Sequence, residues 1–410
     1  MATLYPFRAL RPNADTASRI AAVPYDVVST EEARALAEGN PQSFLRVSRA
    51  ELELPAGSDP YADAVYLRAA DNFAALRKSA LVVEDEPSVY LYRLQMGHHI
   101  QTGLAACFSI DEYDRDLIKK HERTRRDKED DRTRHMLALG AQTGPVFLTY
   151  RASTAIDRVA AAVTTGDPII DFTAPDQVRH TIWRAGGADR DALVAAVGRL
   201  PALYIADGHH RAASAARARA EMRERTLGGT SLGDGADAST MLAVAFPHDQ
   251  VQILSYNRTV KDLGGLSPDA FLAAVRERFD VTPGEGTPSG RGDIAMYFNG
   301  AWHTLRRRVA PDPGDPIGSL DVSVLQEGLL APVLKIADVR TDKRIDFVGG
   351  ARGTRALEQL VDSGKTAVAF SLFPVSVADL MAVSDAGEIM PPKSTWFEPK
   401  LRDGLLIHVI

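Results

Sequence analysis

The chain has 410 residues, of which 45% are hydrophobic and 25% are charged, and its formal net charge is −6 at pH 7. Such a chain can bury a large core and suggests at least two globular domains. The acidic balance disfavours a surface that binds nucleic acid as a whole, and no apolar run approaches the roughly 20 residues that span a bilayer. The single cysteine, Cys107, excludes an intramolecular disulfide and fits a reducing cytoplasm. We therefore expect a cytoplasmic protein without a membrane or nucleic-acid partner, and a homodimer stays open.

The N-terminal part contains two extended segments, residues 6–12 and 23–29, which prolines interrupt. In the second segment Asp26 follows a proline and a tyrosine. Its carboxylate points either inward toward a site or outward from a surface turn, and the sequence leaves both orientations open. Residues 30–37 are expected to form a short helix with acidic residues in its first turn.

Residues 58–79 are expected to form a second helix, with apolar side chains spaced for one buried face. The residues assigned to that face are Ala64, Leu67, Ala70, Phe73 and Leu76. Residues 89–94 and 101–110 are typical of two strands joined by a hairpin, with His98 and His99 near its tip. Neighbouring residues on a strand point to opposite faces, which argues against a metal site at this histidine pair.

Residues 115–134 form the most charged stretch of the chain, with nine basic and six acidic residues. The usual explanation is a solvated helical face on which opposite charges pair. Within this stretch, Lys120, His121 and Glu122 bring together a cation, an imidazole and a carboxylate. These three residues either belong to the solvated face or contribute to a phosphate-binding or catalytic site.

Residues 177–184 alternate polar and apolar side chains, which predicts a half-exposed strand with His180 and Trp183 on opposite faces. Trp183 fits a packing role, whereas His180 is a secondary site candidate. Residues 188–200 are expected to be helical and to lead into a short apolar strand over residues 203–206.

The turn after this strand is the most specific feature of the sequence. A carboxylate, a glycine, two imidazoles and a guanidinium follow one another at Asp207, Gly208, His209, His210 and Arg211. Gly208 can adopt a positive φ and lets a ligand approach the backbone. The N–H groups of the first turn of the following helix favour an anion, and Arg211 adds a planar fork suited to phosphate. In the alternative interpretation Asp207 is only a helix N-cap, but burying so many polar groups at one turn is costly unless they are used.

Two later segments add candidate ligands for an anion. Arg258 follows the end of an expected strand, and Lys393, Ser394 and Thr395 lie in a segment that prolines stiffen. This segment lacks the glycines of a Walker loop. The glycine- and proline-rich residues 283–292 mark an expected subdomain joint.

Residues 207–211 resemble the Asp-Gly-His-His-Arg signature of the ParB/sulfiredoxin-like superfamily, which includes ParB partition proteins, sulfiredoxins and free-serine kinases. The rest of the chain is similar to a large family of that superfamily, a domain of unknown function. The matching segments span nearly the whole chain and are residues 6–12, 23–29, 39–45, 120–124, 143–148, 256–258 and 390–397. The resemblance implies a mixed α/β (α+β) fold with a ParB/sulfiredoxin-like core that N- and C-terminal α/β segments elaborate. The expected N-terminal segment, core and C-terminal subdomain cover residues 1–85, 86–282 and 283–410.

Sulfiredoxins carry a cysteine where this chain has His209, so thiol chemistry is not expected. The resemblance to free-serine kinases implies transfer of a phosphoryl group from ATP, ADP or pyrophosphate to a small, serine-like hydroxyl substrate. Asp207 would bind Mg²⁺ or orient the donor, and His209 and His210 would share in catalysis. The residues expected to hold phosphate are Gly208, His209, His210, Arg211, Lys120, His121, Lys393, Ser394 and Thr395.

The general base is not fixed by the resemblance, because free-serine kinases use a glutamate outside the signature. Asp26 and Glu122 are the candidates in this chain. Two other functions stay open. One is a ParB-like nucleotide-binding regulator or nucleic-acid-associated protein, which the basic residues of 115–134 favour. The other is a phosphate-ester hydrolase that uses the same turn.

Overall fold

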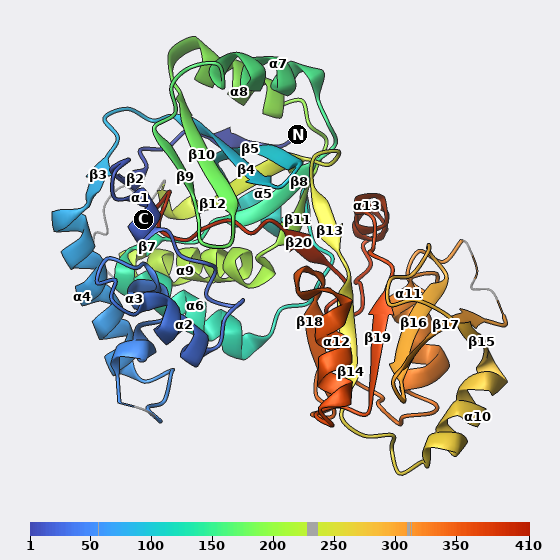
Figure 1. Cartoon of the computed structure of the whole chain (residues 1–410). Helices are drawn as coiled ribbons and strands as arrows, with labels where there is room; N and C mark the ends of the chain where they lie inside the picture. The colour runs from blue at the N-terminus through green and yellow to red at the C-terminus, as the bar shows by residue number, and fades with distance from the viewer. Residues whose placement is uncertain (56, 228–236, 310–311, 313) are drawn as a thin grey trace. The chain divides into compact units, whose positions relative to one another are not determined.

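The structure is a computed structural model that describes residues 1–55, 57–227, 237–309, 312 and 314–410. The chain divides into two compact units, and both contain helices and sheets, so the predicted mixed α/β fold class is confirmed (Figure 1). Unit 1 comprises Met1–Lys120, Thr124–Val251 and Pro399–Ile410, and unit 2 comprises His121–Arg123 and Gln252–Glu398.

Unit 1 is built on a nine-stranded mixed sheet in the order β6-β11-β8-β12-β5-β4-β10-β9, with β1 paired to β5. Only the pairs β6–β11 and β8–β12 are parallel among the strands that the structure describes in this sheet. The strands are β1 Leu4–Tyr5, β4 Val89–Met96, β5 His99–Ser109, β6 Ile118–Lys119, β8 Val146–Tyr150, β9 Ile170–Thr173, β10 Val178–Ala185, β11 Leu203–Asp207 and β12 Thr240–Pro247.

Helices and two small sheets complete unit 1. The helices are α1 Ala17–Ile20, α2 Thr30–Ala37, α3 Leu45–Ser48, η1 Ala50–Glu53, α4 Asp63–Ser79, α5 Ile110–Asp114, α6 Arg126–Leu139, α7 Thr154–Val163, α8 Gly187–Val197, α9 His209–Leu227 and η2 Asp237–Ser239. The two-stranded sheets pair β2 Leu10–Pro12 with β3 Leu81–Val83, and β7 Ala141–Gln142 with β21 His408–Val409. Helices α6 and α9 lie side by side (Figure 1). The small residues Ala212, Ala215 and Ala218 of α9 are buried in the main core, where their size permits close packing.

Two details of unit 1 differ from the sequence prediction. The buried residues of α4 are Val65, Tyr66, Ala69, Phe73 and Leu76, and Ala70 packs against the same core, so only the assignment of Ala64 and Leu67 to that face was wrong. Strand β10 is not half-exposed, because both His180 and Trp183 are buried. Its neighbours β4 and β9 make it an internal strand, and packing covers both faces, which alternation of residue types cannot reveal.

Unit 2 contains a six-stranded antiparallel sheet in the order β15-β17-β16-β19-β14-β18 and a short pair, β13–β20. The strands are β13 Gln252–Leu254, β14 Tyr256–Val260, β15 Phe279–Pro283, β16 Asp293–Phe298, β17 Ala301–Arg307, β18 Ile345–Gly349, β19 Val368–Leu372 and β20 Trp396–Glu398. The helices are α10 Pro268–Arg278, α11 Asp321–Leu325, the π-helix η3 Gln326–Leu330, η4 Gly350–Arg352, α12 Gly353–Asp362 and α13 Val377–Asp385. Residues 283–292, the expected joint, connect β15 to β16 in this sheet.

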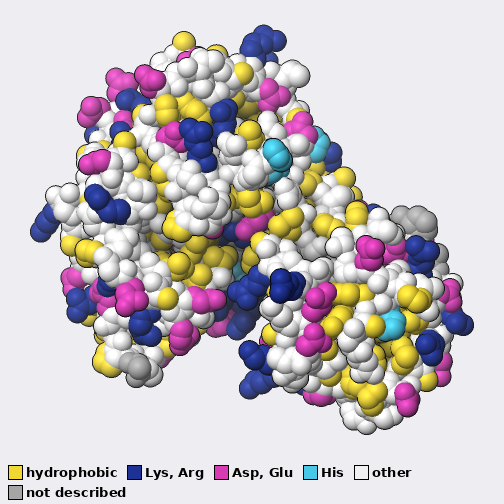
Figure 2. Space-filling view, in the orientation of Figure 1, with side chains coloured by type: hydrophobic (Ala, Val, Ile, Leu, Met, Phe, Trp, Pro, Cys, Tyr) yellow, Lys and Arg dark blue, Asp and Glu magenta, His cyan; other side chains and the backbone are white. Residues whose placement is uncertain are grey.

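Several local predictions are confirmed. Strands β4 and β5 form a hairpin, and His98 lies exposed at its tip. Cys107 is buried in the core. On the face of the molecule drawn in Figure 2, acidic and basic side chains are interspersed over each unit. Within the described part of the chain, none of the helices is both long and apolar enough to cross a membrane.

Candidate functional site

The strand, turn and helix around Asp207 form as the sequence predicted. β11 ends at Asp207, Gly208 has a φ of +93°, and α9 begins at His209. The Ala212 N–H donates to the Gly208 carbonyl over 3.0 Å, which closes the first helical turn. The N–H groups of a first helical turn and the helix dipole favour a negative charge. The backbone therefore has the geometry that an anion site at this turn would require.

Gly208 is required here for two reasons. Its positive φ is unfavourable for residues with a side chain. In addition, a Cβ atom at this position would lie 3.0 Å from Nε and 3.1 Å from Cζ of Arg211. The glycine thus lets the Arg211 guanidinium fold back against the turn.

We expect Gly208→Ala to lower the free energy of unfolding by about 1–3 kcal/mol, because it adds backbone strain and displaces Arg211. The measurement is urea unfolding followed by circular dichroism. Gly39→Ala is the matched control, because Gly39 has a φ of +69° but no atom within 4 Å of the added Cβ. Equal losses in both variants would contradict the contact between Gly208 and Arg211.

Arg211 is an internal ion-pair partner of the turn. Its side chain is only 8% exposed, Nη2 lies 2.9 Å from Oδ2 of Asp207, and Nη1 donates to the Pro145 carbonyl. Burial alone would lower the pKa of Arg211, but the carboxylates of Asp207, Asp26 and Asp403 outweigh burial and raise it. Arg211 therefore stays charged and serves as a counter-ion for the surrounding carboxylates. Its guanidinium is not exposed to solvent, where it could bind a phosphate directly.

Asp207 receives a second cation from the C-terminal segment. Its Oδ1 lies 3.8 Å from Nζ of Lys400, while Oδ2 accepts from Arg211. The Asp207 side chain is 30% exposed, so it can still meet a ligand. The described residues include no group of three or more potential metal-ligating side chains. Both Asp207 oxygens thus face cations.

The two histidines of the turn have different environments. His209 is 4% exposed, whereas His210 is partly exposed. Nε2 of His210 accepts a hydrogen bond from the Arg125 backbone N–H over 3.0 Å, so in the neutral ring the proton is assigned to Nδ1. This bond links the start of α9 to the residue that precedes α6.

Asp403 is a site residue that the sequence analysis missed. Its side chain is 4% exposed. Burial, with a smaller contribution from the charge of Asp26, raises its pKa to about 7 against the opposing effects of Arg211 and Arg132. A Cβ atom on Gly144 would lie 2.6 Å from Oδ1 of Asp403, so that glycine leaves room for the carboxyl group. A buried carboxyl with a pKa near neutrality is typical of functional sites.

Asp403 and Arg211 line a small internal cavity with a volume of about 40 Å³. A cavity of this size holds one to a few water molecules and excludes a nucleotide. Two buried atoms of its lining, Nε of Arg211 and Oγ of Ser48, have no hydrogen-bond partner within the described chain. The cavity thus carries polar groups behind the turn.

The structure brings Asp26 into the electrostatic environment of the turn. Asp26 is exposed, and its negative charge raises the pKa of Arg211 and of Asp403. The pKa of the neighbouring Tyr25 hydroxyl is raised mainly by burial and, to a smaller extent, by Asp26. The Tyr25 ring lies against the Arg132 guanidinium, whose Cζ is 4.2 Å from the ring centroid. Of the two predicted bases, Asp26 is therefore the one that belongs to the same unit and charge network as Asp207.

His180 is fully buried next to the C-terminal segment. Its Nδ1 lies 2.9 Å from the Tyr92 hydroxyl, and its Nε2 accepts from Nε of Arg402 over 3.2 Å. Burial lowers the pKa of His180 well below its usual value, and Arg402 lowers it further. A neutral His180 therefore orients Arg402, the residue before Asp403.

The remaining predicted residues, except Lys120, belong to unit 2. Thr395 Oγ1 lies 3.4 Å from Nε2 of His121, and the Met390 N–H donates to the His121 carbonyl over 2.9 Å. Three further members share Tyr256 as a neighbour: burial raises the pKa of the Tyr256 hydroxyl, Glu122 raises it too, and Lys393 and Arg258 lower it. The Ser394 hydroxyl donates to the Pro391 carbonyl. The members are His121, Glu122, Arg258, Lys393, Ser394 and Thr395. We refer to this group as the unit 2 cluster.

Lys120 lies in unit 1 and has local partners. Its Nζ donates to the Tyr113 carbonyl over 2.9 Å and lies 4.1 Å from the Tyr113 ring centroid. Asp116 lies 3.9 Å from the same ammonium group. The contacts of Lys120 are therefore those of a residue that anchors its own loop.

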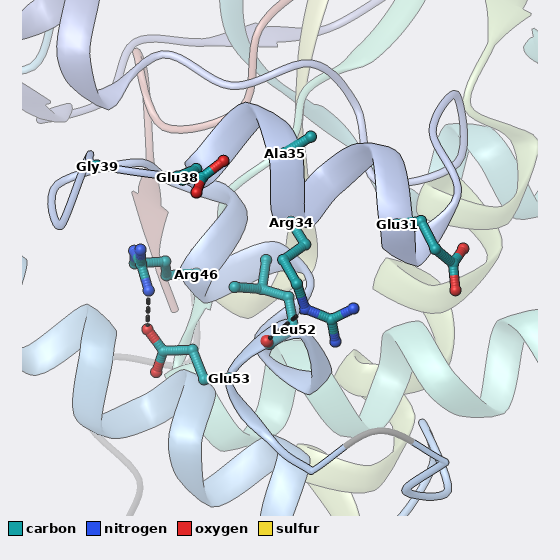
Figure 3. Close-up of a pocket in the computed structure, with 8 residues that line it drawn as sticks. All are labelled: Glu31, Arg34, Ala35, Glu38, Gly39, Arg46, Leu52 and Glu53. Carbon is teal, nitrogen blue, oxygen red and sulfur yellow. Dashed lines mark hydrogen bonds and ion pairs between the residues drawn. The ribbon is translucent and has the colours of Figure 1, made fainter.

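An open pocket of about 710 Å³ lies beside α2 and contains none of the predicted site residues (Figure 3). Arg46 and Glu53 form an ion pair of 2.6 Å across it, and Arg34 donates to the Leu52 carbonyl over 3.3 Å. Arg34, Arg46 and Glu53 thus have partners within the fold, and we assign the pocket no function.

The family relationship agrees with the motifs quoted above. Residues 4–323 match the family model described as "Protein of unknown function (DUF1015)". The chain belongs to the DUF1015 family. The match includes the Asp207 turn and Arg258, whereas Lys393–Thr395 and Asp403 lie beyond it. Placement of the DUF1015 family in the ParB/sulfiredoxin-like superfamily stays a prediction. No curated protein matched this DUF1015 sequence.

Solved structures show only weak likeness to this DUF1015 protein. A conserved hypothetical protein from Pyrococcus furiosus has 13% identity and a TM-score of 0.36, covering 74% of this chain and 95% of its own. A free serine kinase in complex with AMP has 15% identity and a TM-score of 0.36, covering 73% and 92%. SbnI with a C-terminal truncation, from Staphylococcus aureus, has 14% identity and a TM-score of 0.38, covering 74% and 87%. At such TM-scores, these likenesses say nothing about the site.

Proposed function

We propose that this protein transfers a phosphoryl group from a nucleotide or pyrophosphate to a small, serine-like hydroxyl compound. The observation that carries the proposal is the turn at Asp207, where a half-buried carboxylate stands between two cations at the start of a 19-residue helix. The resemblance of residues 207–211 to the signature of free-serine kinases supports the same reaction. Phosphoryl transfer depends mainly on positioning and charge neutralisation, which this turn is equipped to provide.

In this proposal the first turn of α9 receives the donor phosphates. The backbone at Gly208, His209 and His210 supplies the positive end of the helix dipole. Lys400 adds an ammonium group near Asp207, and the buried guanidinium of Arg211 contributes positive electrostatic potential at the turn. Asp207 orients the donor. No step is derived through Mg²⁺, because the described residues form no site for it.

The proton of the attacking hydroxyl passes in this proposal to Asp26. The Asp26 carboxylate is exposed, so a substrate can reach it, and its charge acts on Arg211 of the turn. Loss of that proton makes the substrate oxygen a better nucleophile, which general-base catalysis requires. Asp403 is buried behind Arg211, where it shapes the electrostatic field without touching the substrate.

The test is incubation of the purified protein with ATP, ADP and pyrophosphate carrying labelled phosphate, in the presence of serine and other small hydroxyl compounds. Label that appears in a hydroxyl compound would support the phosphotransferase. Release of inorganic phosphate alone would favour the hydrolase, and retention of label without turnover would favour the nucleotide-binding regulator. Either of the last two results would contradict the proposal.

We expect Asp207→Asn to lower phosphoryl transfer by about 10²–10³-fold, because a charged group that orients the reacting phosphate is lost. Asp171→Asn is the matched control: Asp171 is 31% exposed and pairs with Arg179 over 2.6 Å, much as Asp207 is 30% exposed and pairs with Arg211 over 2.9 Å. The measurement is the initial rate with the labelled donor. Equal rates in the two variants would remove Asp207 from the mechanism.

A further inference from the structure

Arg258 is a fully buried arginine in strand β14 of unit 2, with 1% of its surface exposed. Its Nη1 donates to the Tyr256 carbonyl, and its Nη2 donates to the Lys393 carbonyl over 3.1 Å and to the Pro392 carbonyl over 3.5 Å. Cζ lies 5.5 Å from the ring centroid of Phe347. Its neighbours therefore accept hydrogen bonds but supply no full negative charge.

Other arginines of unit 2 have carboxylate partners. Arg291 pairs with Asp379 over 2.9 Å, Arg306 with Asp293 over 2.5 Å, and Arg344 with Asp342 over 2.8 Å. No carboxylate among the described residues forms an ion pair with Arg258. Burial lowers the pKa of Arg258 to about 10. A buried guanidinium without a counter-charge is costly, and an anionic ligand would remove that cost.

Arg258 lines a pocket of about 270 Å³ that lies wholly within unit 2. This volume is below the range of about 300–1,000 Å³ in which drug-sized ligands bind, so the pocket suits a small molecule. Asp338 and Arg340 also line the pocket, but they pair with each other over 2.8 Å. The positive charge of Arg258 is therefore the uncompensated charge of this lining.

Gln326 gives the same pocket an acceptor without a partner. Its Nε2 donates to the Ile336 carbonyl over 2.9 Å and to the Ala337 carbonyl over 3.3 Å, which fixes the orientation of the amide. Its Oε1 is buried and accepts no hydrogen bond from the described residues. A ligand that brought a donor as well as a negative charge would satisfy both groups.

We propose that this pocket binds a small oxyanion of the hydrogen-phosphate class, with Arg258 neutralising its charge and Gln326 accepting a hydrogen bond from its hydroxyl. Sulfate has similar size and charge but carries no hydroxyl proton at neutral pH, so it can satisfy Arg258 and not Gln326. The site goes beyond the proposed phosphotransferase function, because it lies in unit 2 and requires no turnover.

The test is calorimetric titration of the full chain with inorganic phosphate and with sulfate at equal ionic strength. Because the turn in unit 1 could also bind phosphate, all proteins carry Lys400→Gln, which removes a cation from that turn. We expect phosphate to bind about tenfold more tightly than sulfate, and Arg258→Gln to weaken phosphate binding by about 10- to 100-fold. Arg344→Gln is the matched control: Arg344 also donates to two carbonyls, of Leu334 and Lys335, but has a carboxylate partner. It should keep the affinity unchanged.

A second variant covers the case in which Arg258→Gln does not fold. Val339 is half-buried in the pocket lining, so Val339→Phe should fill the pocket and abolish phosphate binding while leaving Arg258 in place. The proposal is overturned if the Lys400→Gln protein binds no phosphate, if it binds sulfate equally well, or if Arg258→Gln or Val339→Phe retains full affinity. These binding results are independent of the labelled-donor assay, so the two proposals fail separately.

Discussion

Replacement of Arg211 by alanine is expected to lower the free energy of unfolding of unit 1 by about 3–5 kcal/mol, the usual cost of removing one partner from a buried ion pair. The Arg211 guanidinium is buried, bonds to Asp207 and to the Pro145 carbonyl, and feels the charges of Asp26 and Asp403. Without it, buried Asp403 and half-buried Asp207 lose their shared cation. The measurement is chemical unfolding at pH 7.

Arg179→Ala is the control for Arg211→Ala. Arg179 forms an ion pair of 2.6 Å with Asp171, but its side chain is 53% exposed, so its removal should cost less than about 1 kcal/mol. A similar small loss for Arg211→Ala would show that the guanidinium is not the internal counter-ion of the turn. A large loss would also mean that this variant is a poor probe of catalysis, because reduced activity would then follow from reduced stability.

Replacement of Asp403 by asparagine should change how stability depends on pH. Burial raises the pKa of Asp403 from its usual 3.8 to about 7. Between these two values the folded state holds a proton that the unfolded state has released, so the free energy of unfolding falls as pH rises from about 4 to about 7. Asparagine resembles the neutral acid, and the variant should therefore be more stable than the wild type at pH 8, by an amount on the order of 1–4 kcal/mol.

The experiment compares unfolding free energies of both proteins at pH 5, 6, 7 and 8. The difference between variant and wild type should already be present at pH 5, grow through pH 6 and level off above about pH 7, because it accumulates between the unfolded-state and folded-state pKa values. Asp171→Asn should have the opposite sign at pH 8, because hydrogen bonds from Arg179 lower the pKa of Asp171 and make its ionised form the stabilising one. If Asp403→Asn is less stable than the wild type at pH 8, the fold favours the ionised carboxyl group and the pKa of Asp403 is not raised.

At the turn, the positive charge of Arg211 is set against the negative charges of the surrounding carboxyl groups. Arg211 lies among several carboxyl groups, and one of them, Asp403, is favoured in its neutral form. Asp207, with 30% of its side chain exposed, is the member that a donor can reach. For this reason Asp207→Asn is the sharper probe of activity, and Asp403→Asn is the sharper probe of the charge balance.

Local features of the site could be predicted because short segments determine them. An apolar run followed by a glycine and by helix-forming residues produces β11, the bend at Gly208 and α9 wherever the rest of the chain lies. The hairpin β4–β5 was predictable for the same reason. In α4, however, several apolar residues lie on neighbouring faces, and only packing decided that Leu67 is exposed.

The sequence by itself determined the mixed α/β class, the DUF1015 family motifs and the strand–glycine–helix turn, because each depends on residues that are close together in the chain. Only the tertiary structure showed that Arg211 points inward, that Asp403 approaches it from the last residues of the chain, and that Arg258 has no counter-charge. These facts depend on burial and on partners far away in sequence. An exposed arginine can bind a phosphate, whereas a buried arginine such as Arg211 forms an ion pair within the fold. The reason is that a guanidinium removed from water is stabilised most by a nearby opposite charge.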